Sequence, residues 1–192
     1  MSQNDRPLSN CILYNENGNP LTNSSSFMSS TNGIVTATAA GGSVTSIAYL
    51  WHPNTNTKRI EIHRIDVGVT NITTPALSPP GVATIRGSFI SAENGTPGGT
   101  SQTIISTDRV DSSSAGLVFR TGANAPTRVN GTLINWNSSV NQSPYFVWET
   151  SLFGKPIVLR SGVSEGFEIR VVMEVASAAT PQISVCYYWT EI

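Results

Sequence analysis

Residues 166–176, GFEIRVVMEVA, decide the fold class, because apolar and polar side chains alternate along them with a period of two. That period is the mark of a β-strand with one buried face. We expect the odd-numbered side chains in a core and the even-numbered ones mostly in water. The odd-numbered side consists of Phe167, Ile169, Val171, Met173 and Val175, and the even-numbered side of Glu168, Arg170, Val172, Glu174 and Ala176.

Two other long segments show the same alternation. Residues 182–192, QISVCYYWTEI, place Ile183, Val185, Tyr187 and Trp189 on one side. Residues 58–70, KRIEIHRIDVGVT, instead change their apolar parity between Ile62 and Ile65. A change of phase near His63 and Arg64 predicts a β-bulge, or a strand that passes from one sheet to another.

The remaining chain consists of short strand-forming runs separated by Pro, Gly and Asn. No window of eleven or more residues carries a helical stripe. The pattern predicts an all-β antiparallel sandwich or barrel, with the last four strands, from Tyr145 onward, forming a meander. Further runs of β-branched and aromatic residues lie at 44–51, 82–90, 102–106, 116–121, 129–136, 144–152 and 156–160.

Residues 1–43 differ from the rest, because small polar and turn-forming residues dominate them. We expect an extended or mobile N-terminal arm that orders only against a partner, followed by a β-sandwich at 44–192. A loop-rich start that lies on its own domain is the alternative. The apolar anchors of this segment are Cys11, Ile12, Leu13, Tyr14, Leu21, Phe27 and Met28.

The composition excludes several partners. Charged residues make up 12% of the 192 residues and leave a net charge of −1, whereas Ser, Thr and Asn number 25, 21 and 16. Binding to nucleic acid requires a basic surface that this chain lacks. The sequence also contains no apolar run of about 18 residues and no secretory start. We therefore expect neither a direct nucleic-acid partner nor membrane insertion.

The titratable residues suggest no catalytic centre. His52 and His63 have no serine or cysteine in a recognisable nucleophile motif beside them, so both are expected to be structural or exposed. Glu165, Glu168 and Glu174 could form a carboxylate pair of the glycosidase type. The outward parity of Glu168 and Glu174 instead favours a solubilising role. We predict no catalytic residue.

No cofactor or metal site is predicted either. Asp108 and Asp111, in STDRVDSSS, could offer oxygens to a cation, but two carboxylates fall short of the six to eight ligands that calcium takes. Cys11 and Cys186 are far apart and outside any metal or redox spacing. Cys186 is expected to be a buried thiol. The sequence leaves open whether a disulfide bridge joins the two cysteines.

The aromatic residues permit two interpretations. They could build a platform on which sugar rings stack. On alternating strands they more often belong to a core or a subunit interface, which we favour. The residues in question are Trp51, Trp136, Trp148, Trp189, Tyr145, Tyr187 and Tyr188.

Three segments carry a resemblance to a known family. They are AYLWHPNTNTKRIEIHRIDVGV at 48–69, RTGANAPTRVNGTLINW at 120–136 and FVWETSLFGKPIVLRSGVSEGFEIRVVMEV at 146–175. In their order, the region from Ala48 to Ile192 resembles small jelly-roll proteins of tailed-bacteriophage virions, of the head-decoration and fibre- or tail-associated kind. The resemblance implies a jelly-roll-like β-sandwich without enzymatic activity or cofactor. It also implies assembly as a trimer or a pseudo-symmetric cluster on a virion that forms in the host cytoplasm.

The implied partner is the major capsid protein or another virion protein, reached partly through the N-terminal arm. Because Trp and Tyr are preferred at interface hot spots, we look for partner contacts in the arm and the last strand. A carbohydrate-binding module or adhesin tip is the alternative function, with host-surface glycan as ligand and loops 91–103 and 121–128 as binding loops. An esterase or glycosidase on a β-sandwich is a third. The predicted contact residues are Leu13, Tyr14, Phe27, Met28, Tyr187 and Trp189.

Overall fold

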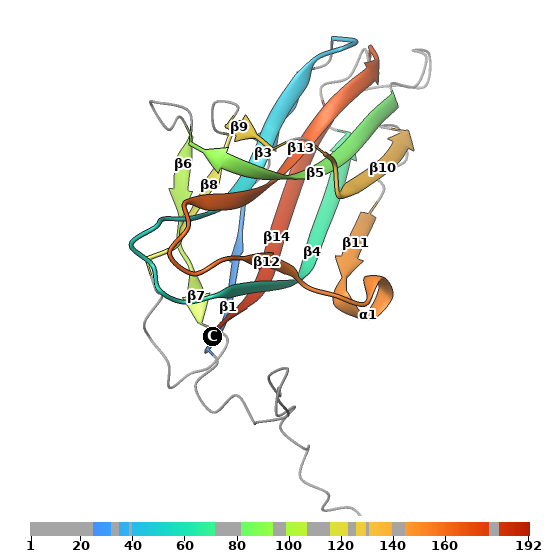
Figure 1. The fold of residues 1–192 in the computed structure, drawn as a ribbon. Helices are drawn as coiled ribbons and strands as arrows, with labels where there is room; N and C mark the ends of the chain where they lie inside the picture. The colour runs from blue at the N-terminus through green and yellow to red at the C-terminus, as the bar shows by residue number, and fades with distance from the viewer. Residues whose placement is uncertain are drawn as a thin grey trace, which may run out of the picture.

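Two antiparallel sheets pack face to face in the computed structural model of the chain (Figure 1). Within the described part, no helix is long and apolar enough to cross a membrane. The structure describes residues 25–31, 35–38, 40–71, 82–93, 99–106, 116–122, 126–129, 131–139, 145–176 and 181–192.

The first sheet contains seven strands. They are β1 (Ser25–Ser30), β2 (Val35–Thr36), β4 (Ile60–Asn71), β7 (Ile105–Ser106), β11 (Tyr145–Glu149), β12 (Ile157–Leu159) and β14 (Pro181–Glu191). Their order is β11-β4-β14-β1-β7, with β12 also pairing with β4 and β2 with β14. One helical turn, α1 (Thr150–Phe153), follows β11 and ends at Gly154, whose φ of 83° is readily adopted by glycine.

The second sheet also contains seven strands. They are β3 (Val44–His52), β5 (Val82–Ala92), β6 (Thr100–Gln102), β8 (Val118–Thr121), β9 (Thr127–Arg128), β10 (Ile134–Ser139) and β13 (Glu165–Val175). Their order is β10-β5-β13-β3-β8-β6, and β9 pairs with the same edge of β5 as β10.

The strand order is that of a jelly roll. The eight principal strands in chain order are β1, β3, β4, β5, β10, β11, β13 and β14. One sheet pairs the first, eighth, third and sixth of these, and the other pairs the second, seventh, fourth and fifth. This double Greek key confirms the predicted jelly-roll-like antiparallel sandwich. Strands β6 to β9 are an insertion between the fourth and fifth principal strands.

The expected meander from Tyr145 onward is wrong. Strands β11 and β12 both pair with β4, β13 pairs with β3 and β5, and β14 pairs with β4 and β1. Short connections suggested neighbours in one sheet. Here β11 and β12 stay in one sheet beside β4, whereas the connections before and after β13 cross to the facing sheet. Burying both apolar faces against each other outweighs pairing of consecutive strands.

The core follows the predicted alternation. The inward side chains of β13 and β14 are at most 1% exposed, from Phe167 to Met173 and from Ile183 to Trp189. Val175, at the end of β13, is 48% exposed instead. The hydroxyl of Tyr187 donates to the carbonyl oxygen of Phe167 across the core at 3.2 Å, which links the two sheets.

The phase change in β4 is a β-bulge. Tyr188 of β14 pairs with Arg64 and Trp189 pairs with Ile62, so His63 is the extra residue. The bulge turns the apolar residues on both sides of it toward the same core, and the strand stays in one sheet. The first of the two predicted explanations is confirmed.

The sandwich begins before residue 44. β1 pairs with β14 over six residues and β2 extends this contact, while Phe27 is 1% exposed and stacks on Trp189. A strand that completes a sheet gains backbone hydrogen bonds and needs few apolar side chains. The serine-rich composition therefore led to a predicted boundary between arm and sandwich that lies too late in the chain. Residues 1–24 lie outside the described residues, and the arm stays a prediction for them.

Candidate interaction surfaces

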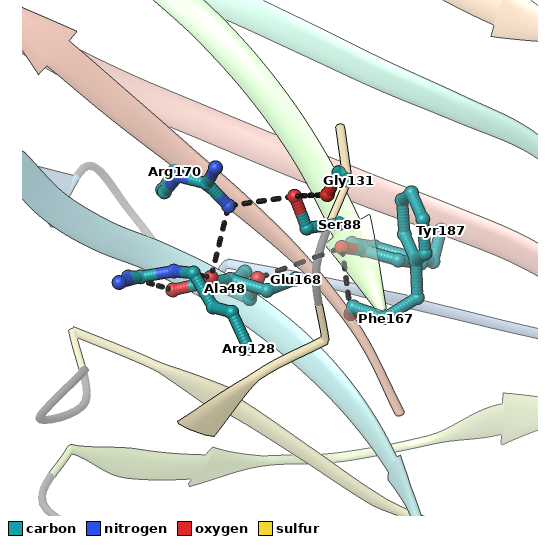
Figure 2. A network of polar contacts seen from close by, with 8 residues as sticks. All are labelled: Ala48, Ser88, Arg128, Gly131, Phe167, Glu168, Arg170 and Tyr187. Carbon is teal, nitrogen blue, oxygen red and sulfur yellow. Dashed lines mark hydrogen bonds and ion pairs between the residues drawn. The ribbon is translucent and has the colours of Figure 1, made fainter. Parts of the chain in front are cut away.

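Glu168 forms the most buried charged contact on the outward side of the second sheet (Figure 2). Its carboxylate is 0% exposed and accepts hydrogen bonds from Nε and Nη2 of Arg128 at 2.6 and 2.9 Å. Arg170 approaches the same carboxylate at 3.5 Å. The expectation that this side of β13 lies mostly in water is wrong for Glu168 and Arg170, which are both buried.

The segment around β9 covers the Glu168 carboxylate. Arg128 pairs with Ile90, and the amide of Val129 donates to the carbonyl of Phe89. The Ser88 hydroxyl donates to the carbonyl of Gly131 at 3.0 Å. These contacts hold the segment along β5, from which the Arg128 side chain reaches across to Glu168.

Arg170 completes this network. Its Nη1 donates to the Ser88 hydroxyl at 2.8 Å, which in turn reaches Gly131, as Figure 2 shows. Burial, together with the charge of Arg128, lowers the pKa of the Arg170 guanidinium. Since the polar groups satisfy one another, the network fixes the β9 segment on the sheet and offers no reactive group.

Three glutamates were considered above for a carboxylate pair, and each of them forms an ion pair with a different arginine. Arg160 donates to Glu165 at 2.7 Å, and Arg86 donates to Glu174 at 2.8 Å, just as Arg128 does to Glu168. A small hollow of about 210 Å³ lies beside β5, but none of the three glutamates lines it. Its lining consists of Phe89, Val129, Gly131, Thr132 and Leu133.

Both histidines serve structural contacts. His52 is fully buried, with Nδ1 3.0 Å from the carbonyl oxygen of Val163 and Nε2 2.8 Å from that of Lys58. It therefore ties two loops to the end of β3. His63 lies 2.8 Å from the Thr190 hydroxyl, and burial lowers its pKa against the opposing charge of Glu61.

The described ranges contain no cluster of three or more His, Cys, Asp or Glu that could hold a metal ion. Asp108 and Asp111 lie outside them. Cys186 is a free, partly buried thiol whose pKa is raised by burial. Cys11, the other cysteine of the disulfide bridge considered above, lies outside the described residues.

Most of the aromatic residues belong to the core, as favoured above. Trp148, Trp189 and Tyr187 are at most 4% exposed, and Trp51 is 8% exposed on the outward side of the second sheet. Only Tyr145 and Tyr188 of the seven lie on the outward side of the first sheet. The alternative interpretation, a sugar-stacking platform, is therefore not assembled from these seven side chains.

The predicted partner contacts need correction. Phe27, Tyr187 and Trp189 are buried inside their own sandwich at 0–1% exposure, which leaves no surface for a partner. These three side chains lie on the inward side of their strands. The preference for aromatic residues at interface hot spots does not reveal on which side of a strand a residue lies. Met28 points outward beside Phe27, and Leu13 and Tyr14 lie outside the described residues.

The outward side of the first sheet, which we call the open face, has a different character. One row of residues runs in register across its five main strands: Ile105, Met28, Tyr188, Arg64 and Glu149. Arg64 donates to Asp66 at 2.7 and 3.1 Å and lies 5.6 Å from the centre of the Tyr188 ring. Ile105 and Tyr145 are 55% and 61% exposed.

Sequence reasoning missed the open face for an identifiable reason. Met28 stands among serines, and Tyr188 stands at the outward parity of a strand whose inward side attracted attention. The available signal was the outward set of β14, where Ser184, Cys186 and Tyr188 carry no charge. Depletion of charge with Met and Tyr present is typical of an interface centre.

No known protein family matches this sequence, and no curated protein is significantly similar to it. Among solved structures, that of Cocksfoot mottle virus shows 9% identity and a TM-score of 0.31, covering 85% of this chain and 91% of the other. A structure of infectious bursal disease virus, Gt strain, shows 9% identity and a TM-score of 0.20, covering 100% of this chain and 44% of its own. The jelly-roll assignment rests on the strand order of the chain itself.

Proposed function

We propose that this chain is a non-enzymatic structural protein of a virus particle that decorates or stabilises a bacteriophage capsid, or a neck, tail or fibre part. The observation that carries the proposal is the open face of a jelly-roll sandwich. Its central side chains are uncharged or paired, while Ile105 and Tyr145 are exposed. Such a surface suits burial against another protein.

The ionisable groups support binding rather than catalysis. Glu165, Glu168 and Glu174 each engage an arginine, and His52 lies between two carbonyl oxygens. Catalysis needs a convergent set with at least one group free to exchange a proton or attack a substrate. Most of the aromatic residues lie in the core, so stacking on sugars receives no comparable support.

The partner is the major capsid protein or another virion protein, met through symmetric contacts of a homotrimer. Residues 1–24, with Leu13 and Tyr14 as anchors, supply the anchoring arm. The part removed in a test must be limited to these residues, because Phe27 of β1 belongs to the core.

Gradient sedimentation of the native source material tests the proposal. Mass spectrometry then follows this chain and the major capsid protein across the fractions. We expect co-sedimentation at a fixed ratio, high for a lattice decoration and low for a tail or fibre part. A chain that stays at the top of the gradient would overturn the virion assignment.

The arm is tested by deleting residues 1–24 and adding the purified chain back to particles that lack it. We expect particle binding to be lost while the thermal unfolding midpoint stays that of the full chain. A matched control replaces only Leu13 and Tyr14 by serine. Undiminished binding by the deletion variant would refute the anchoring role.

A further inference from the structure

The two lateral edges of the sandwich differ in length. Figure 1 shows β6 and β7 on one side and β10 and β11 on the opposite side. β6 and β7 have three and two residues, whereas β10 and β11 have six and five. Proteins keep exposed edge strands short, or protect them with charge or proline, because unpaired backbone groups recruit other strands.

β10 lacks these protective devices. Its sequence, INWNSS, contains no charged residue and no proline. It pairs with β5 along one edge, and no other described strand pairs with its second edge. Asn135 and Asn137 are exposed on its outward side. A neutral strand opposes itself without electrostatic repulsion, so the edge is suited to a second copy of the same strand.

Exposed apolar side chains are concentrated in the part of the chain that contains β10 and β11. Trp136 of β10 stacks on Phe146 of β11 at 5.0 Å between ring centroids, so the edges of the two sheets lie together. Five of the eight large apolar side chains that are exposed in the described ranges come from residues 129–153. These five are Val129, Leu133, Tyr145, Leu152 and Phe153.

We propose that β10 pairs antiparallel with β10 of a second copy across a two-fold axis, which continues the second sheet through both copies. Exposed Leu133, which directly precedes β10, supplies apolar contact beside the strands. This addition matters because strand pairing alone falls short of the roughly 800 Å² per partner of a stable interface. The contact uses one edge only and leaves three-fold contacts elsewhere unaffected.

The two-fold axis is centred on Trp136. In that register Asn135 of one copy lies opposite Asn137 of the other, and the exposed amides are cross-strand neighbours. The contact is isologous, so each substitution acts twice in the dimer. The proposal does not depend on the virion role, because it is tested on the isolated chain.

Sedimentation equilibrium of the full chain and of two paired variants provides the test. The variant N135K/N137K places lysine opposite lysine, and N135K/N137E places lysine opposite glutamate at the same positions. We expect a dimer for the wild type, at least about 100-fold weaker dimerisation for N135K/N137K, and dimerisation within about tenfold of wild type for N135K/N137E.

Two controls accompany the measurement. T100K places a lysine on β6, at the opposite edge, and is expected to dimerise like the wild type. Urea unfolding of each variant checks that the sandwich is intact, since Asn137 accepts a hydrogen bond from Thr84. A monomeric wild type, a dimeric N135K/N137K, or equal loss in both folded double variants would each overturn the proposed pairing.

Discussion

The outward faces of the two sheets contain the same kind of ion pair in different surroundings. Arg128 donates two hydrogen bonds to Glu168 on the second sheet, and Arg64 donates two to Asp66 on the first. The Glu168 side chain is 0% exposed, and its arginine is 28% exposed. The corresponding values for Asp66 and Arg64 are 12% and 44%.

The two ion pairs differ in exposure because the segment around β9 covers Glu168. The difference shows that an outward position on a strand is not always exposed to water. The β9 segment lies along β5 and brings Arg128 over β13. On the open face, Arg64 and its acceptor Asp66 stand two residues apart on the same strand, β4. A charged residue at an outward position is therefore part of a surface only where no other segment of the chain covers it.

Removing Arg128 is expected to have the largest effect. Arg128→Met keeps an apolar stem but leaves Glu168 buried with Arg170 alone, at 3.5 Å. A buried charge that loses its partner costs several kcal/mol, and partial access of water reduces this, so we expect a loss of about 2–3 kcal/mol. Urea unfolding measures the change.

The double variant Arg128→Met/Glu168→Gln is the control for this experiment. Removing the orphaned charge should restore at least half of the lost free energy of unfolding. A single variant within about 0.5 kcal/mol of the wild type would show that the cover contributes little, and that the two faces are energetically alike.

The matched change on the open face is expected to have a smaller effect. Arg64→Met removes the ion pair to Asp66 and the contact with the Tyr188 ring, both in partial contact with water. We expect a loss of no more than about 1 kcal/mol, which decreases as salt is added. A loss equal to that of Arg128→Met would contradict the distinction between the faces.

The smallest expected effect is a pH dependence from His63 at the bulge. Burial lowers its pKa below the ordinary value of 6.5, so the unfolded chain takes up a proton more readily than the folded one. The stability contributed by this group is present above pH 6.5 and is lost as the pH falls toward the folded pKa. The largest change in urea midpoint is expected in this window.

His63→Gln retains a polar group near Thr190 but cannot titrate. The variant should lose part of the decrease in stability below pH 6.5. The comparison is made by urea unfolding above and below this pH. An identical pH profile in variant and wild type would exclude His63 as the titrating group.

Period-two alternation was sufficient to predict the three long strands β4, β13 and β14. Residues 166–176 and 182–192 became the central strands β13 and β14, and the parity change in residues 58–70 became the bulge at His63. Such patterns are local, because neighbouring side chains of a strand point to opposite faces and one face must leave water. The absence of a helical stripe likewise agreed with a structure whose described helix is one turn.

The sequence failed where the outcome depended on distant segments. Phe27 looked like an arm anchor, but pairing of β1 with β14 made it part of the core. Tyr187 and Trp189 looked like partner contacts because residue type does not reveal which face is covered. The Met28, Tyr188 and Arg64 row required the register of three strands far apart in the chain.

The sequence by itself determined that this chain is an all-β protein with little charge, because period and composition are properties of neighbouring residues. The tertiary structure alone decided which strands pair, which outward face is covered, and which of the described strands lie at the edges. Those features depend on contacts between segments up to 166 residues apart, such as Ser25 with Glu191, and no local pattern encodes them. The two candidate surfaces, the open face and the β10 edge, therefore emerged only with the fold.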